Sequence, residues 1–132
     1  MSWVRIWIHA VFTTKNREPL LDKNVRLKVF RHMKENATEK KIWIDCVNGY
    51  TDHAHCLLSL SRELSLSKTM QLIKGESSHW INKNQIIQKK FEWQDDYWAA
   101  GIGENYVKNV RKYIFRQEAH HAKKKFQESW MN

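Results

Sequence analysis

Apolar and polar residues alternate along several stretches of the chain, and the period of the alternation changes from stretch to stretch. Between Trp3 and Thr13 apolar residues occupy every second position, which predicts a β-strand. From about Leu21 to Lys40 they recur every three or four positions, with Lys and Arg between them, which predicts a helix. A polar loop with Pro19, the only proline, separates these two predicted elements.

The period of two returns in two short runs. Ile42–Val47 predicts a second strand and His53–Leu60 predicts a third. Between them, Asn48-Gly49 followed by Tyr50-Thr51-Asp52 has the composition of a hairpin turn. We therefore expect the second and third strands to be antiparallel neighbours.

Two more helices and a less regular stretch follow. Ser67 is a candidate N-cap of a helix in which Gly75 costs about 1 kcal/mol relative to alanine and invites a close-contact explanation. Residues 91–102 predict short strand segments, and the last helix runs from about Glu104 to roughly Lys124. This order predicts an α/β (α+β) fold, a ferredoxin-like βαββαβ sandwich with an antiparallel sheet, plus a C-terminal helix.

The composition of the chain indicates which classes of partner it can bind and in which compartment. The 132 residues carry 23 Lys and Arg against 14 Asp and Glu, a net charge of +9, which favours a polyanionic partner such as nucleic acid. Cys46 and Cys56 form neither a CxxC pair nor a disulfide framework, so a reducing cytoplasm is expected. No signal peptide is evident and no apolar run approaches the ~20 residues that span a bilayer, so we expect a soluble protein without a membrane partner.

Two histidines one residue apart begin the third predicted strand. Side chains alternate faces along a strand, so His53 and His55 point to the same side and Cys56 to the other. Both imidazoles can then reach one ion or one phosphate. Alone, such a pair is more often structural, because a metal site needs a third ligand. His9, in the first strand, is assigned no role as a ligand.

The last predicted helix can supply the missing groups. Tyr113 and Gln117 are four residues apart, so they lie one above the other on one helix face. A glutamine oxygen suits Mg²⁺, while Mn²⁺ accepts histidine more readily. A nearby cation would help the Tyr113 hydroxyl attack a phosphate as phenolate, giving a covalent phosphotyrosine. Tyr97 and Tyr106 are rival nucleophiles by residue type, and only the joint arrangement favours Tyr113.

These residues resemble those of the single-tyrosine HUH transposases of small bacterial insertion sequences. The resemblance rests on His53-Ala54-His55, on the Tyr113-to-Gln117 spacing and on the loop at residues 13–17. Residues 74–78 and 117–121 look especially like the branch that includes the REP-associated tyrosine transposases. The similarity covers nearly the whole chain, from the first strand to the final helix.

The resemblance implies one catalytic domain over residues 1–132 that cuts and rejoins single-stranded DNA near hairpins. His53, His55 and Gln117 would bind Mg²⁺ or Mn²⁺. Tyr113 would attack the phosphorus, leaving a 5′-phosphotyrosine and a free 3′-hydroxyl that can later reverse the step without ATP.

The resemblance also implies a homodimer, in which the tyrosine helix of one chain can complete the site of the other. Gly101 and Gly103, just before that helix, would be a natural hinge for such an exchange. REP-associated relatives can instead be monomers, so assembly in cis and in trans both stay open. Five cations are candidate DNA contacts: Lys15, Arg17, Lys74, Arg111 and Arg116.

Two alternatives remain. The first is a non-enzymatic single-stranded nucleic-acid-binding module of the same fold, although no aromatic RNP1-like sequence is present. The second is a zinc protein that uses the two histidines with Cys46, although neither finger nor deaminase spacing occurs.

Overall fold

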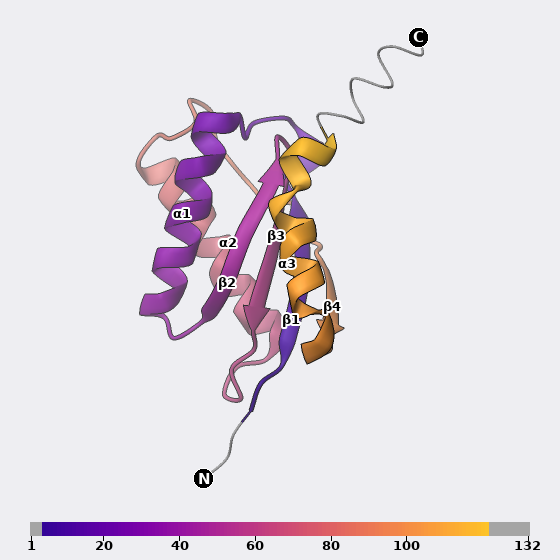
Figure 1. The fold of residues 1–132 in the computed structure, drawn as a ribbon. Coiled ribbons are helices and arrows are strands. Elements are labelled where there is room, and N and C mark those ends of the chain that lie inside the picture. The colour runs from indigo at the N-terminus through magenta and orange to yellow at the C-terminus, as the bar shows by residue number, and fades with distance from the viewer. Residues whose placement is uncertain (1–3, 122–132) are drawn as a thin grey trace.

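The computed structural model describes residues 4–121, which form a four-stranded antiparallel sheet in the order β2-β3-β1-β4 (Figure 1). The central strands are β1 and β3, and the edges are β2 and β4. This order confirms the predicted ferredoxin-like sandwich. The elements are β1 (Trp7–Thr13), α1 (Lys23–Glu39), β2 (Trp43–Tyr50), β3 (His53–Ser59), α2 (Leu66–Lys83), β4 (Trp98–Ile102) and α3 (Val107–Phe115), with short 3-10 helices at Lys15–Arg17 and Glu104–Tyr106.

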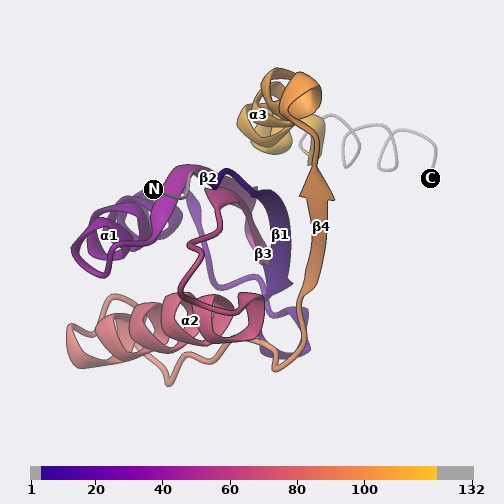
Figure 2. The ribbon, with the colours of Figure 1, turned by 90° about the horizontal axis from the view of Figure 1, so that it is seen from below.

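The two faces of the sheet are covered differently. Helices α1 and α2 lie on one face and α3 lies on the other (Figure 2). The larger apolar cluster fills the space beneath α1 and α2, and the smaller one joins α3 to the opposite face. In β1, Ile8, Ala10 and Phe12 belong to the larger cluster, as the period of two predicted. We call the surface beneath α3 the α3 face.

Strand β2 contains an extra residue, Asp45. Ile44 pairs with Leu58 and Cys46 pairs with Leu57, so Asp45 is the bulged residue between them. The bulge changes which residues share a face, because Ile44 packs in the larger cluster whereas Cys46 packs beneath α3.

The hairpin turn is shorter than predicted. Strand β2 continues through Asn48 and Gly49 to Tyr50, which pairs with His53, and only residues 51–52 form the turn. Gly49 serves a close strand approach, since a Cβ atom there would lie 2.1 Å from the backbone oxygen of His53. The prediction that Asn48-Gly49 forms the turn is therefore wrong.

Other predicted boundaries also move. Ser65, rather than Ser67, caps α2, because its hydroxyl accepts a hydrogen bond from the amide of Lys68 at 3.0 Å. Gly101, which was expected to belong to a hinge together with Gly103, lies within β4. The last helix begins with a 3-10 turn, breaks its regular pattern at Arg116 and continues over residues 117–121. The predicted end near Lys124 lies outside the described residues, as does Trp3, where the first strand was expected to begin.

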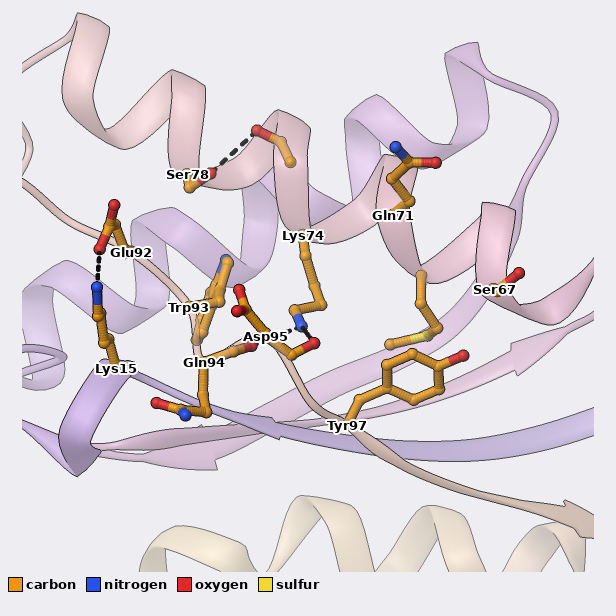
Figure 3. Close-up of a pocket in the computed structure, with 12 residues that line it drawn as sticks. Lys15, Ser67, Gln71, Lys74, Ser78, Glu92, Trp93, Gln94, Asp95 and Tyr97 are labelled. Atoms are coloured by element: carbon orange, nitrogen blue, oxygen red, sulfur yellow. Dashed lines mark hydrogen bonds and ion pairs between the residues drawn. The ribbon is translucent and has the colours of Figure 1, made fainter.

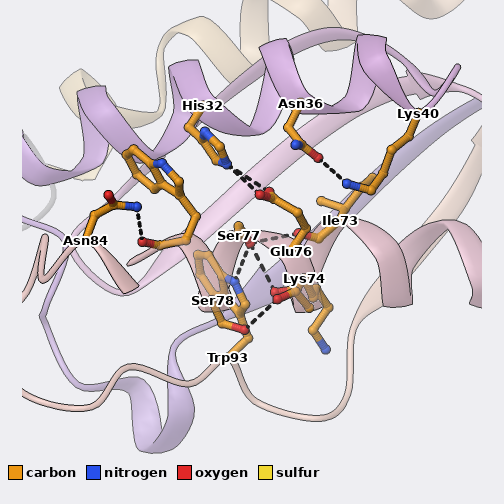
Figure 4. A network of polar contacts seen from close by, with 12 residues as sticks. His32, Asn36, Lys40, Ile73, Lys74, Glu76, Ser77, Ser78, Asn84 and Trp93 are labelled. Carbon is orange, nitrogen blue, oxygen red and sulfur yellow. Dashed lines mark hydrogen bonds and ion pairs between the residues drawn. The ribbon is translucent and has the colours of Figure 1, made fainter. Parts of the chain in front are cut away.

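Helix α2 anchors the segment that leads into β4 (Figure 4). The hydroxyl of Ser77 accepts a hydrogen bond from the indole of Trp93 at 2.9 Å. The ammonium group of Lys74 donates to the carbonyls of Gln94 and Asp95 at 2.6 and 2.8 Å. This part of the 74–78 motif therefore positions the chain entering the edge strand.

No helix within residues 4–121 is long and apolar enough to cross a membrane.

Candidate active site

The two histidines of β3 are buried beneath α3, and a partner occupies Nδ1 of each ring. His53 donates from Nδ1 to the carboxylate of Asp52 at 2.7 Å. Nδ1 of His55 shares a hydrogen bond of 2.9 Å with Nε2 of His9. Such contacts orient metal-binding histidines in proteins and leave Nε2 as the coordinating atom.

His9 is a site residue that the sequence did not reveal. It lies on β1, where it pairs with Leu57, two positions from His55. Its ring stacks on that of His55 with centroids 5.2 Å apart, and Trp98 lies edge-on at 5.3 Å. The period of two left open whether His9 faces the core, and it is the β1–β3 register that brings it beside His55.

Burial favours the neutral form of His9 and His55. It lowers the pKa of His9, and it is the main cause that lowers the pKa of His55 to about 3, with smaller electrostatic contributions from His53, His9 and His121. The neutral imidazole is the form that coordinates metals. His55 therefore needs to lose no proton before it binds an ion near neutral pH.

Asp52 links the hairpin turn to the basic loop. Its pKa lies below the ordinary value because, although burial raises it, the hydrogen bond from His53 and the charges of His53 and Arg17 outweigh burial. The guanidinium of Arg17 contacts the carboxylate of Asp52 at 3.2 Å. The backbone carbonyl of Asp52 accepts a hydrogen bond from the amide of Thr14 at 2.9 Å. Arg17, a predicted DNA contact, thus pairs with the residue that orients His53.

Polar contacts hold α3 over β2 of the same chain. Arg111 makes a two-point contact with Asp45, at 2.8 and 2.9 Å. The side-chain amide of Asn48 donates to the carbonyls of Ile114 and Phe115, at 3.1 and 3.2 Å. These two carbonyls lie at the end of α3, so the amide of Asn48 fixes the position of that end. The bulge residue and the strand residue opposite His55 therefore both fasten the tyrosine helix.

Tyr113 contacts the histidine cluster from α3. Its ring centroid lies 5.7 Å from that of His55 and 6.1 Å from that of His9, edge-on to both. Its side chain is 51% exposed, so a ligand can reach it from solvent. Tyr106 lies before α3 and is also exposed, whereas Tyr97 packs on the opposite face. Of the three candidate tyrosines, Tyr113 is the one whose ring contacts the histidines within residues 4–121.

Gln117 is buried one helical turn beyond Tyr113, with 1% of its surface exposed. Its Nε2 donates to the carbonyl of Tyr113 at 3.3 Å, and its Oε1 accepts from Nε2 of His121 at 3.0 Å. The ring of His121 lies 4.7 Å from that of His53 and stacks on Tyr50 at 5.4 Å. His121 therefore connects Gln117 to His53. The spacing of 113, 117 and 121 was the available signal for it.

A buried arginine on α1 holds the segment that follows α3. Arg26 is 5% exposed, pairs with Glu118 at 2.8 Å and donates to the carbonyl of Leu21 at 3.1 Å. Its guanidinium also lies over the ring of Tyr50, 5.3 Å from the centroid. Because Glu118 follows Gln117, this ion pair helps to fix the glutamine.

The proposed donor set fits a divalent cation in its chemistry. Within residues 4–121, no group of three or more His, Cys, Asp or Glu side chains is arranged to hold a metal ion. The predicted set is of another kind, because it combines two histidines with the amide oxygen of Gln117. Two imidazoles whose Nδ1 atoms are engaged, and a buried amide, suit Mn²⁺ or Mg²⁺.

The cysteines are poorly suited to zinc. Cys46 packs against Leu57, Val107 and Ile114, and burial first, then the adjacent Asp45, raises the pKa of its thiol to about 12. Cys56 lies in the larger cluster on the opposite face, as predicted. A zinc site needs the thiolate form.

The other predicted DNA contacts differ in whether another group of the protein already binds the cation. Lys15 pairs with Glu92 at 2.9 Å, and Lys74 and Arg111 make the contacts described above. Arg116 is exposed and lines, with Lys112 and Tyr113, a hollow of about 630 Å³. Within the described part of the chain it makes no ion pair. Of the five predicted DNA contacts, Arg116 is thus the one that lines the hollow beside Tyr113.

Comparisons with known proteins identify the family and the fold. A family model described as "Transposase IS200 like" matches residues 2–117. A search of curated proteins finds no match. Among solved structures, the chain resembles a Deinococcus radiodurans R1 protein assigned as a transposase, with 17% identity and a TM-score of 0.70 over 89% of this chain and 94% of that one. It also resembles a REP-associated tyrosine transposase bound to a REP hairpin, with 18% identity and a TM-score of 0.59 over 86% of this chain and 66% of that one. At these identities the structural likeness shows the fold.

Proposed function

Because the chain belongs to the IS200-like transposase family, we propose that it cleaves and rejoins single-stranded DNA near hairpins in a metal-dependent reaction. Membership of the family implies nuclease and strand-transfer activity. The proposal adds the roles of individual residues. Tyr113 is the nucleophile, and His53, His55 and Gln117 hold Mg²⁺ or Mn²⁺.

The strongest support is the meeting of the tyrosine and histidines within one chain. The ring of Tyr113 lies 5.7 Å from that of His55, although 58 positions separate them in the sequence (113 − 55). Gln117 follows one turn later and is hydrogen-bonded to His121, which contacts His53. A buried histidine pair beside a half-exposed tyrosine suits phosphoryl transfer better than a purely structural role.

The reaction exchanges one phosphate ester bond for another. The hydroxyl oxygen of Tyr113 loses its proton and forms a bond to phosphorus, while the bond from phosphorus to the 3′-oxygen breaks. That oxygen takes a proton and leaves as a 3′-hydroxyl, and the 5′ end stays joined to Tyr113. A 3′-hydroxyl can then attack the phosphotyrosine, restoring a phosphodiester and the tyrosine. A divalent cation held by His53, His55 and Gln117 would offset the negative charge of the phosphate and would favour the phenolate form of Tyr113.

Neighbouring residues orient the groups that react. Asp52 and His9 hold the two imidazoles by their Nδ1 atoms. Asn48 and Arg111 hold α3, so the ring of Tyr113 stays close to His55. Such support keeps the reacting groups near their working geometry.

A covalent adduct provides the test. Wild-type protein incubated with Mn²⁺ and a hairpin-bearing single strand should form a protein–DNA adduct that survives denaturant. Tyr113→Phe should abolish the adduct and keep DNA binding, whereas Tyr106→Phe, at another exposed tyrosine, should form it normally. A binding module without activity would give no adduct with any variant. An adduct that persists in Tyr113→Phe would show that another residue is the nucleophile.

A further inference from the structure

The side-chain amide of Gln117 can lie in two orientations that fill almost the same space. They differ by half a turn, which exchanges the oxygen with the nitrogen. The oxygen accepts hydrogen bonds and can bind Mn²⁺ or Mg²⁺, whereas the nitrogen donates hydrogen bonds and cannot bind either ion. The ligand role proposed for Gln117 therefore requires a group that selects one orientation.

Two partners select the orientation that the structure shows. Nε2 of Gln117 donates to the carbonyl of Tyr113 at 3.3 Å, and Oε1 accepts from Nε2 of His121 at 3.0 Å. An amide oxygen only accepts, so His121 is the donor of the second bond. This bond is the shorter of the two, and Gln117 is 1% exposed, so water has little access to replace it. Reversing the amide would place two acceptors together at Tyr113 and two donors together at His121.

The ring of His121 is itself held from several sides. It stacks on Tyr50 of β2, with an angle of 19° between the ring planes, and lies edge-on to His53. The guanidinium of Arg26, a buried residue of α1, lies over the same Tyr50 ring. An imidazole packed in this way has little freedom to turn its donor away from Gln117.

The contacts of His121 suit a donor to Gln117 better than a metal ligand. Although its ring touches that of His53, no group of three or more His, Cys, Asp or Glu side chains within residues 4–121 is arranged to hold a metal ion. Its Nε2 atom is engaged with Gln117. An amide oxygen has two lone pairs, so Oε1 can accept from His121 and still bind an ion.

We propose that His121 is a positioning residue, which donates to Oε1 of Gln117 and so keeps the oxygen rather than the nitrogen available to the cation at His53 and His55. This assignment rests on the proposed function. It adds a residue that acts through Gln117 and not on the cation itself, as groups that orient metal ligands do.

Mn²⁺ affinity, measured by calorimetry without DNA, tests this role separately from catalysis. His121→Phe keeps an aromatic ring to stack on Tyr50 and removes the donor, so it should weaken Mn²⁺ binding about tenfold. His121→Gln returns an N–H donor at a similar reach and should bind within about threefold of wild type. His79→Phe, the same change at an exposed histidine of α2, should bind Mn²⁺ as wild type does.

Gln117→Glu gives the sharpest test, because a carboxylate has an oxygen at each end and leaves no orientation to select. Adding His121→Phe to Gln117→Glu should therefore cause no further loss of Mn²⁺ affinity, although His121→Phe alone costs about tenfold. Gln71→Glu controls for the added charge. Gln71 is exposed and lines a cleft between α2 and the segment before β4, on the sheet face opposite α3 (Figure 3).

Three results would overturn the role of His121: wild-type Mn²⁺ affinity in His121→Phe, affinity in His121→Gln as weak as in His121→Phe, or an equal loss from His121→Phe in the Gln117→Glu protein. Failure of wild type to bind Mn²⁺, or wild-type affinity in Gln117→Ala, would instead reject the metal site of the proposed function, and the role of His121 with it.

Discussion

The two faces of the sheet hold their helices by different means. Beneath α1 and α2, apolar side chains such as Phe12, Val29 and Met70 form a continuous buried cluster. Beneath α3 the buried apolar cluster is small, and polar contacts from Asp45 and Asn48 supplement it. Burial of apolar area is the larger source of stability, whereas polar contacts set direction. We therefore expect the first face to determine stability and the second to determine the geometry of the site.

Mixing two inactive variants tests whether the α3 contacts assemble the site within one chain. His53→Ala and Tyr113→Phe should each form no adduct, and the two chains expressed together should form none, because each chain would use its own tyrosine. In a dimer that exchanged tyrosine helices, the mixture would recover about a quarter of the wild-type sites. Recovery of that size, measured by adduct yield, would assign the site to two chains and contradict assembly in cis.

Phe12→Ala should produce the largest loss of stability. The ring is fully buried in the larger cluster and packs edge-on against Trp93 at 4.7 Å. Its removal should lower the free energy of unfolding by about 3–5 kcal/mol, measured by urea denaturation. A loss below about 1 kcal/mol would mean that the first face is not the main source of stability.

Gly49→Ala should disturb the head of β3. Its Cβ atom would lie 2.1 Å from the backbone oxygen of His53, so the two strands must separate. We expect a loss of about 1–3 kcal/mol in unfolding free energy, together with a lower adduct yield. Gly101→Ala is the control, because a Cβ atom there meets nothing within 4 Å. Equal behaviour of the two variants would contradict the close strand approach.

The ion pair between Arg111 and Asp45 should give the smallest effect. The hydrogen bond from Arg111 outweighs burial and holds the pKa of Asp45 below its ordinary value. A carboxyl whose pKa is lower in the folded state adds stability above its unfolded pKa. That stability is lost as the pH falls through the folded value. The pair is partly exposed, so its contribution should be below about 1 kcal/mol.

Comparing wild type with Arg111→Met by urea unfolding at pH 7 and pH 3 measures that contribution. The stability difference between the two proteins should be present at pH 7 and smaller at pH 3. A difference that grows as the pH falls would have the wrong sign for this pair.

Periodicity alone was enough for the order of the elements and for the shared face of His53 and His55. It could not identify His9, because the β1–β3 register that brings this residue beside His55 is a long-range property. The shorter hairpin turn could not be predicted for a related reason. Asn48-Gly49 is strong local turn chemistry, but the pairing of Tyr50 with His53 prevails over it. His121 shares a helix face with Tyr113, yet only docking of that helix brings it to His53.

Because Asp45 is a bulge residue, the contact between Asp45 and Arg111 that holds α3 can be gained or lost without moving His53 and His55. Deleting this one residue would leave Ile44 and Cys46 adjacent, opposite the same two partners on β3, so every later strand pair could stay in register. Insertion or deletion of a single codon could therefore add or remove Asp45, whose carboxylate pairs with Arg111. Relatives could differ in how firmly the tyrosine helix is held while keeping the same histidines. Such a position allows evolution to adjust the freedom of α3 in one step.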